Sequence, residues 1–316
     1  MAHITFIHGI ANKPDCDALL RIWLQALARN DGPDLGSEGI SASMVYWADV
    51  MYAAPLIDDG RYESVADDDF ESIRQDGITP EQAEDWREEL PPDEAAQIDA
   101  LARHLGADEP DEEVDPVPIG TPEAELERIP LPWAIKKPMM ERLLRDVHHY
   151  LFNALHSPRP GVQFRVQDEI RARFVAAIEA GNTLATGTPH VVVSHSMGTV
   201  IAYDCLKRVA SCPSVSALMT LGSPLGLDEI QDMLKPEWRR NDGFPTPRVR
   251  GRWVNVFDRL DPVAGFDPHF ANDYRRDGAE AVEDIQEANW GAWRHSITKY
   301  LQGRQLRAAL TQLLTP

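Results

Sequence analysis

The sequence predicts an α/β fold in which a mostly parallel sheet of about six strands is flanked by helices. Short apolar runs rich in β-branched residues alternate with amphipathic helical segments, as expected where crossover helices connect parallel strands. Polar residues follow several of these runs directly, at the strand ends where such sheets bind ligands. With 316 residues, 43% of them hydrophobic, the chain can form one large domain with an insertion or two small domains.

The first part of the chain predicts a helix between two strands. The strands are expected over residues 3–7 and 42–47. The helix between them, over residues 15–29, carries large apolar side chains at helical spacing on one face, namely Leu19, Leu20, Trp23, Leu24 and Leu27. The alternation of strands and helices therefore begins with the first strand.

A strongly acidic segment interrupts this pattern. Residues 58–127 contain 25 Asp and Glu against 4 Arg, which accounts for the whole net charge of −20. Such a shift in composition indicates an insertion. We therefore assign residues 1–48 and 160–316 to an α/β core and residues 49–159 to an acidic, largely helical cap. The acidic run is explained by a solvated, solubilising surface better than by a docking site.

The cap is expected to contain three helical stretches, over residues 80–90, 93–105 and 138–154. The last stretch is amphipathic and has basic neighbours, Lys136, Lys137, Arg142 and Arg145. Packing of its apolar stripe into the cap explains the pattern best, because the stripe is no broader than a core helix needs. Contact of residues 136–152 with a membrane surface is the alternative.

Beyond residue 160 the alternation of helices and strands resumes, which favours parallel pairing with right-handed crossovers. The predicted helices cover residues 166–180, 199–209 and 297–314, and the predicted strands cover residues 191–193, 217–221, 252–257 and 281–286.

Composition argues against several classes of function. The acidic balance makes a nucleic acid an unsuitable partner. The cysteines, Cys16, Cys205 and Cys212, are odd in number and lack metal-ligand spacing, which predicts reduced thiols in the cytoplasm. The first residues resemble no signal peptide, and no apolar stretch approaches the roughly 18 residues of a membrane-spanning helix.

The most specific motif is Ser194-His195-Ser196-Met197-Gly198, which stands between a predicted strand and a predicted helix. The small residues Ser194 and Gly198 allow a turn sharp enough to lift the Ser196 hydroxyl clear of the sheet. The next helix then points its N-terminus at a developing oxyanion. A helix-capping serine is the simpler alternative. The motif resembles the nucleophile elbow of the α/β-hydrolase superfamily, in which glycine is commoner at the first small position.

The resemblance implies that the catalytic acid and base follow the serine in that order. The string from Asp258 to Val263 follows the fifth predicted strand and resembles the acid turn of lipases and esterases, with Asp261 as the acid. Asp258 would then be a turn cap or a supporting residue, and it is the alternative acid. Of ten histidines only His269 and His295 come after Asp261, and His295 occupies the loop position of the superfamily's base.

A second stretch resembles the oxyanion loop of the same superfamily. His8, Gly9 and Ile10 follow the first predicted strand. The resemblance implies that the backbone N–H groups of Ile10 and Met197 stabilise the oxyanion. Gly9 permits backbone conformations that other residues cannot adopt. His8 precedes the serine in the chain, so we expect it to be a structural hydrogen-bonding residue.

These residues imply a serine hydrolase that cleaves carboxylic esters, such as lipid-like acyl esters. Ser196 would attack, His295 would carry the proton and Asp261 would orient the imidazole, with no metal or organic cofactor. Peptidases, amidases and thioesterases use the same residues, and neither fold nor triad separates them. A catalytically silent module that binds a basic partner through the acidic segment is a hypothesis of another class. The expected partner is a small-molecule or acyl-ester substrate.

Overall fold

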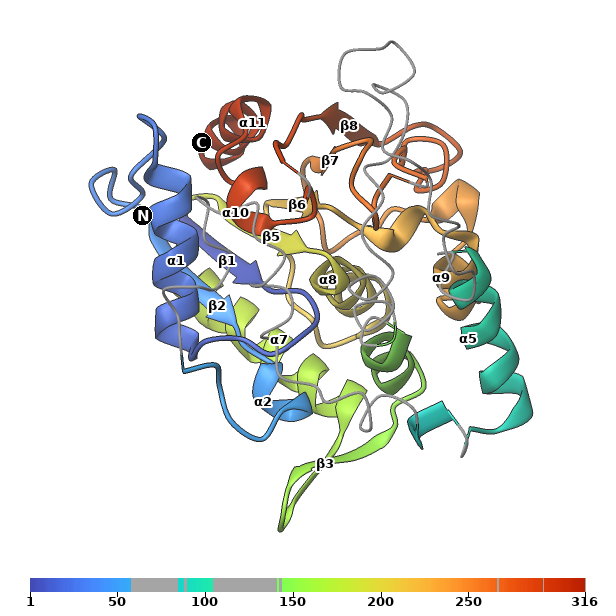
Figure 1. The fold of residues 1–316 in the computed structure, drawn as a ribbon. Helices are drawn as coiled ribbons and strands as arrows, with labels where there is room; N and C mark the ends of the chain where they lie inside the picture. Colours follow the sequence, from blue (N-terminus) through green and yellow to red (C-terminus); the bar gives the residue numbers. More distant parts are fainter. Residues whose placement is uncertain are drawn as a thin grey trace, which may run out of the picture.

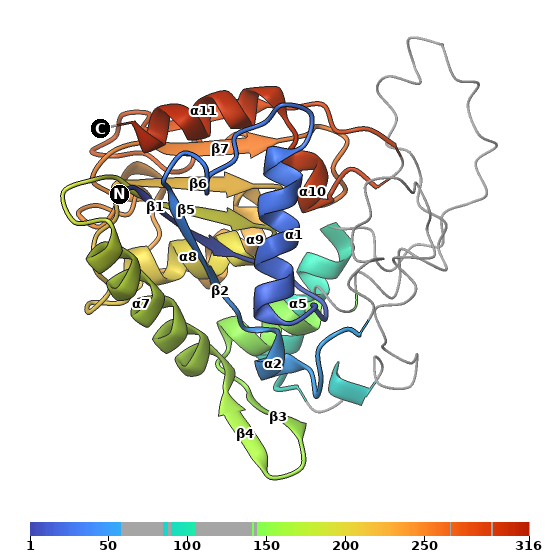
Figure 2. The same ribbon diagram turned by 90° about the vertical axis from the view of Figure 1, so that its left-hand side faces the viewer.

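Six parallel strands form one sheet in the computed structural model, in the order β2-β1-β5-β6-β7-β8, and helices cover both faces (Figures 1 and 2). This architecture confirms the predicted α/β class and the expected size of the sheet. The structure describes residues 1–57, 85–87, 90–104, 141, 144–265, 267–291 and 293–315.

The strands coincide with the apolar runs of the sequence. Four central strands are buried, as expected where helices cover both faces of a parallel sheet. The two edge strands are partly exposed. The strands are β1 (His3–Ile7), β2 (Ser41–Val45), β5 (His190–His195), β6 (Ala217–Leu221), β7 (Trp253–Phe257) and β8 (Val282–Gln286).

The two faces of the sheet bury separate hydrophobic cores. Successive side chains of a strand point to opposite faces. Phe6 of β1 therefore packs with one set of helices, and the next residue, Ile7, packs with the other. The first set comprises α1 (Cys16–Ala28), α10 (Ile297–Tyr300) and α11 (Arg304–Leu314), and the second includes α7 (Val166–Leu184) and α8 (Met197–Arg208).

The strand order creates a switch point between β1 and β5. From β1 the chain continues outward to β2, whereas from β5 it continues in the opposite direction through β6, β7 and β8. Ile7 at the end of β1 pairs with Ser194 near the end of β5. Open α/β sheets bind ligands in the crevice at such a point, outside the carboxyl ends of the strands.

The described residues between β2 and α7 add no strand to this sheet. They form the short helix α2 (Ala48–Met51), the 3-10 turn η1 (Asp85–Arg87) and helix α5 (Pro92–His104), and residues 144–151 are also helical. Helix α5 confirms the helix predicted over 93–105. Most of the helix predicted over 80–90 lies outside the described residues, and so do residues 136–140 and 142–143 of the basic amphipathic stretch.

A β-hairpin that the sequence did not predict follows this segment. Its antiparallel strands are β3 (Leu155–Arg159) and β4 (Val162–Arg165), and it projects from the body of the molecule (Figures 1 and 2). Gly161 in the turn has φ +78°, which favours glycine. The boundary that we placed between residues 159 and 160 falls inside this hairpin.

The C-terminal region differs from the single helix predicted over 297–314, which is wrong. Helix α10 ends at Tyr300 and α11 begins at Arg304. Glu287, directly after β8, accepts a hydrogen bond from the Leu306 amide at 2.8 Å and thereby caps α11. A Cβ at Gly303 would lie 2.7 Å from the Glu287 carboxyl carbon and 2.9 Å from the Tyr300 carbonyl oxygen, so a side chain there would displace this cap.

Short helices also occupy the stretch between β6 and β7, where the sequence predicted none. They are η2 (Pro224–Gly226), α9 (Asp228–Met233) and η3 (Arg240–Asp242). In the part of the chain that the structure describes, no helix is both long enough and apolar enough to cross a membrane.

Candidate active site

Ser196 occupies the sharp turn between β5 and α8, at the switch point of the sheet. Its backbone has φ 53° and ψ −130°, a conformation that is strained for a residue with a side chain. Strain of this kind persists at functional sites where the surroundings enforce it. The side chain makes no capping hydrogen bond to α8, so the alternative of a helix-capping serine is wrong.

Two glycines allow β1 and α8 to approach this turn. A Cβ at Gly198 would lie 2.5 Å from the His8 carbonyl oxygen and 2.7 Å from that of Ile7. A Cβ at Gly9 would lie 2.7 Å from the Cβ of Ser196. Both positions therefore require glycine, and this close packing brings the loop after β1 to the N-terminus of α8.

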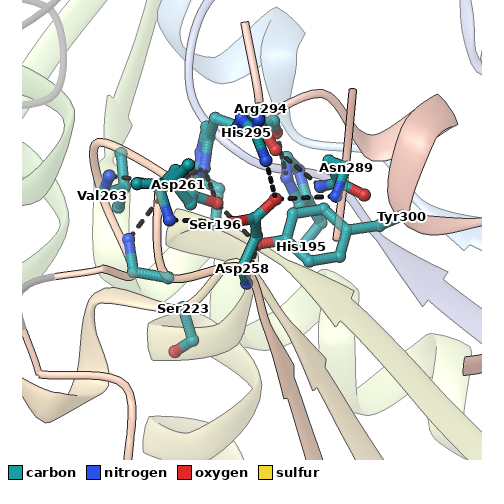
Figure 3. A network of polar contacts seen from close by, with 12 residues as sticks. His195, Ser196, Ser223, Asp258, Asp261, Val263, Asn289, Arg294, His295 and Tyr300 are labelled. Atoms are coloured by element: carbon teal, nitrogen blue, oxygen red, sulfur yellow. Dashed lines mark hydrogen bonds and ion pairs between the residues drawn. The ribbon is translucent and has the colours of Figure 1, made fainter. Parts of the chain in front are cut away.

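Ser196, His295 and Asp261 form one continuous line of hydrogen bonds (Figure 3). His295 Nε2 lies 2.9 Å from Ser196 Oγ, and His295 Nδ1 lies 2.9 Å from each carboxylate oxygen of Asp261. The side chains come from three different strand ends, and all are buried. In this geometry Nδ1–H donates to the carboxylate, which leaves Nε2 free to accept the serine proton.

The Asp261 carboxylate is held by four donors. Besides His295, it accepts the Tyr300 hydroxyl at 2.7 Å and the Val263 and Ala264 amides at 2.7 and 3.1 Å. Burial alone raises the pKa of Asp261, but His295, Tyr300 and the Val263 amide together outweigh it and bring the pKa below its ordinary value. Asp261 is therefore ionised at neutral pH.

Asp258 has a different set of contacts. Its carboxylate accepts the Leu260 amide at 2.8 Å and the Asn289 amide at 2.7 Å, and it pairs with Arg294 at 3.3 Å. Its own amide donates to the Tyr300 hydroxyl at 3.0 Å. Asp258 thus fixes the loop before His295 from one side, and the structure places Asp261, not Asp258, against the imidazole.

His8 is buried and bound on both ring nitrogens. Its Nε2 accepts the Trp47 amide at 3.0 Å, so its Nδ1 carries the proton and donates to the Gly9 carbonyl at 2.8 Å. Burial, and then the charge of Lys13, lower the pKa of His8 well below its ordinary value. His8 is therefore a neutral structural residue, in the arrangement that the sequence led us to expect.

The backbone amides of Ile10 and Met197 flank the Ser196 turn. Ile10 follows the close contact of Gly9 with Ser196, and Met197 is the first residue of α8. Within the described part of the chain, neither amide donates to another protein group. Both amides are therefore available to an oxygen atom bound beside Ser196, which is what an oxyanion hole requires.

The two residues before Ser196, His195 and Ser194, connect β5 to neighbouring parts of the site. His195 donates from Nε2 to the backbone carbonyl of His295 at 2.9 Å, and the two rings lie 4.8 Å apart. Burial, and then the neighbouring His295, lower the pKa of His195 well below its ordinary value, so this ring is neutral. The Ser194 hydroxyl donates to the Met219 carbonyl at 3.1 Å.

Sequence reasoning missed Tyr300 and the role of His195. Tyr300 follows His295 by five residues, and nothing in the local sequence marks it as a partner of Asp261. His195 stands inside the recognised motif, but its hydrogen bond to the His295 backbone joins residues 100 positions apart. Ser223, a second buried serine shown in Figure 3, is hydrogen-bonded to Thr199 at 2.6 Å.

No group of three His, Cys, Asp or Glu side chains in the described ranges is arranged to hold a metal ion. No protein-family model matches the chain, and no curated protein matches it. Among solved structures, an uncharacterized protein from Pseudomonas aeruginosa is 10% identical, with a TM-score of 0.24. The match covers 81% of this chain and 35% of that one. A likeness this weak carries no argument about fold or function.

Proposed function

We propose that the protein is a serine hydrolase of the α/β-hydrolase superfamily that cleaves carboxylic esters. The observation that carries this proposal is the hydrogen-bonded line from Ser196 Oγ through His295 to Asp261, with both links at 2.9 Å. The strained backbone of Ser196 at the switch point of the sheet supports it, because strain of this kind gathers at functional sites.

In the first half of the reaction, Ser196 Oγ attacks the ester carbonyl while His295 Nε2 takes the serine proton. The carbonyl oxygen becomes an oxyanion, which the Ile10 and Met197 amides stabilise. When the intermediate collapses, His295 returns the proton to the departing alkoxide, and an alcohol leaves. The product of this half-reaction is an acyl ester of Ser196.

In the second half, His295 removes a proton from water, and the resulting hydroxide attacks the acyl carbonyl. Collapse of this intermediate releases the carboxylic acid, and His295 returns the proton to Ser196. Asp261 keeps the imidazole in the tautomer with hydrogen on Nδ1 and stabilises the imidazolium that forms twice in each cycle. Its lowered pKa keeps it anionic for that role.

Apolar side chains beside the triad favour an ester with an apolar acyl group. The Trp293 ring lies 5.7 Å from that of His295, and Ile10, which follows the glycine packed against Ser196, is only partly buried. Both pack against the larger of the two cores. We therefore propose a small-molecule or lipid-like acyl ester as the substrate.

Hydrolysis of p-nitrophenyl esters with acyl chains of two to sixteen carbons tests this function. We expect turnover by the wild type and a loss of at least about 10⁴-fold in Ser196→Ala, with thermal stability almost unchanged. Turnover that survives in Ser196→Ala would contradict the proposal. Labelling by a fluorophosphonate without turnover of any ester would mean that Ser196 is reactive but that the substrate is an amide or a thioester.

A further inference from the structure

Buried side chains hold both peptide groups on either side of the Ile10 Cα. The Gly9–Ile10 peptide is held at its carbonyl by His8 Nδ1 at 2.8 Å. The Ile10–Ala11 peptide is held at both ends: its carbonyl accepts the Lys13 ammonium, and its N–H donates to Asp146 Oδ2 at 3.3 Å. With both planes held, the direction of the Ile10 N–H is fixed.

Asp146 is the only one of these three side chains that does not come from the loop after β1. It belongs to the helical residues 144–151, and it lies 135 positions away from Ala11 in the chain. Its carboxylate is buried, and its two oxygens have different partners. Oδ1 accepts the Arg145 guanidinium at 2.9 and 3.2 Å, whereas Oδ2 faces the Ala11 amide.

Arg145 offsets the desolvation cost of this buried carboxylate. A buried charge is costly unless it is paired and hydrogen-bonded. Arg145 supplies the opposite charge and is itself held by the Tyr52 hydroxyl at 2.9 Å, with its guanidinium 5.2 Å from the Tyr52 ring. The anion is thus anchored on one side and presents its second oxygen to the oxyanion loop.

Ala11 adopts a conformation that needs such an anchor. Its φ is 70°, in the left-handed region that residues with a Cβ rarely occupy. Strained backbone persists where neighbouring groups over-determine it, and such positions gather at functional sites. Ala11 immediately follows Ile10, whose N–H we assign to the oxyanion hole, and Asp146 holds Ala11 by its amide.

We infer that Asp146 is a positioning residue of the oxyanion hole, through which the helical residues 144–151 support the reactivity of the site. Asp146 holds Ala11 in the left-handed conformation and thereby aims the Ile10 N–H at the oxyanion. Loss of one oxyanion donor costs about 10²–10³-fold in kcat in serine hydrolases, so a misdirected donor costs a substantial part of that. This inference rests on the proposed function.

Asp146→Ala tests the inference through kcat and the affinity for a transition-state analogue. Both quantities depend on the oxyanion donor, and a loss of fold stability alone would leave them unchanged. We expect kcat to fall about 10–10²-fold with KM nearly unchanged. Affinity for an alkyl boronic acid should fall in parallel, because its tetrahedral adduct with Ser196 places an oxygen in the oxyanion hole. The pH profile of kcat/KM should not shift, because the contacts of His295 and Asp261 are unaltered. Asp146→Asn keeps an oxygen for the Ala11 amide and should lose less.

Glu94→Ala is the matched control. Glu94 pairs with His148 at 2.7 Å, on the same helical stretch as Asp146, but does not contact the oxyanion loop. We expect this variant to lose stability and keep both kcat and boronate affinity. An equal loss of activity in Glu94→Ala would overturn the inference, because general loosening of the helix would then explain both variants.

Unchanged kcat and boronate affinity in folded Asp146→Ala would also overturn the inference. If that variant does not fold, the double variant Arg145→Met/Asp146→Leu decides, because it removes the acceptor of the Ala11 amide without leaving a buried unpaired charge. A loss of several-fold in both quantities supports the inference, and values equal to wild type overturn it. Failure of the proposed function is recognised separately, by a wild type that neither turns over esters nor reacts with a fluorophosphonate.

Discussion

At the scale of single residues, two aspartates in the turn after β7 have carboxylates that face different partners. Asp261 contacts the imidazole of His295, whereas Asp258 contacts backbone amides and Arg294. We expect Asp261→Asn to lower kcat about 10⁴-fold, because an amide favours the wrong imidazole tautomer. Asp258→Asn should lose far less. Steady-state kinetics of the two variants checks this, and the reverse ranking would assign the acid to Asp258.

Tyr300 joins these two aspartates. Its hydroxyl donates to Asp261 and accepts the amide of Asp258. We expect Tyr300→Phe to lower kcat and to reduce the free energy of unfolding by about 1–3 kcal/mol, because the buried charge loses a donor and the buried amide loses its acceptor. Kinetics and urea unfolding of the same preparation give both quantities.

Tyr203→Phe is the control for that variant. The Tyr203 hydroxyl is also buried and donates to the Gly243 carbonyl at 2.7 Å, on the α8 side of the sheet. Its loss should reduce stability by a similar amount and leave kcat unchanged. A fall of kcat in Tyr203→Phe as large as that in Tyr300→Phe would mean that activity follows stability alone.

The sequence was sufficient to propose the candidate nucleophile, acid and base, because each lies between a strand and the next helix or strand, in the order of the superfamily that the Ser196 motif resembles. It was not sufficient for the residues that hold them. Tyr300, Asp146 and the His195 side chain act through contacts that depend on how distant elements pack. No local pattern encodes such contacts.

At the scale of elements, the junction of β1 with α8 depends on Gly198. A Cβ there would collide with the carbonyl oxygens of Ile7 and His8, and backbone atoms cannot move aside cheaply. We expect Gly198→Ala to push α8 away from the β1 loop, which lowers kcat at least tenfold and destabilises the fold by about 1–3 kcal/mol.

Gly39→Ala separates backbone strain from this collision. Gly39 has φ +70° but open space around its Cβ position, so alanine there costs only conformational strain. We expect a small loss of stability and full activity. If Gly198→Ala behaves like Gly39→Ala, the close approach at the elbow has no role in activity.

The regular elements were predictable because burial on both faces leaves a clear apolar run, as in β6, where the predicted and observed bounds agree. The β3–β4 hairpin was missed because its strands are short and half exposed, and Pro158 in β3 and Pro160 in the turn are unfavourable for a strand. The break between α10 and α11 was missed because Glu287, which caps α11, comes from a different element.

At the scale of the whole molecule, stability should depend on buried neutral histidines. Burial, and then the nearby His3, lower the pKa of His190 to about 4, and burial, and then His156, lower that of His149 to about 3. Between these values and about 6.5 the unfolded chain binds more protons than the folded protein. The free energy of unfolding must therefore fall as the pH falls below about 6.5.

Urea unfolding at pH 7.5, 6.0 and 5.0 measures this dependence. His190 alone contributes a slope of up to about 1.4 kcal/mol per pH unit. His190→Gln keeps a partner for Thr5 and Asn182, to which the imidazole is bonded at 2.9 and 2.8 Å, and should reduce the slope. Stability that stays constant down to pH 5.0 would contradict the assignment of neutral buried histidines.

The nucleophilic character of Ser196 is the central claim, and intact-protein mass spectrometry after reaction with a fluorophosphonate tests it most directly. We predict one covalent adduct per chain, mapped to Ser196 by peptide analysis, absent in Ser196→Ala and formed much more slowly in His295→Ala. An unlabelled wild type, or an adduct on another residue such as Ser223, would contradict the claim.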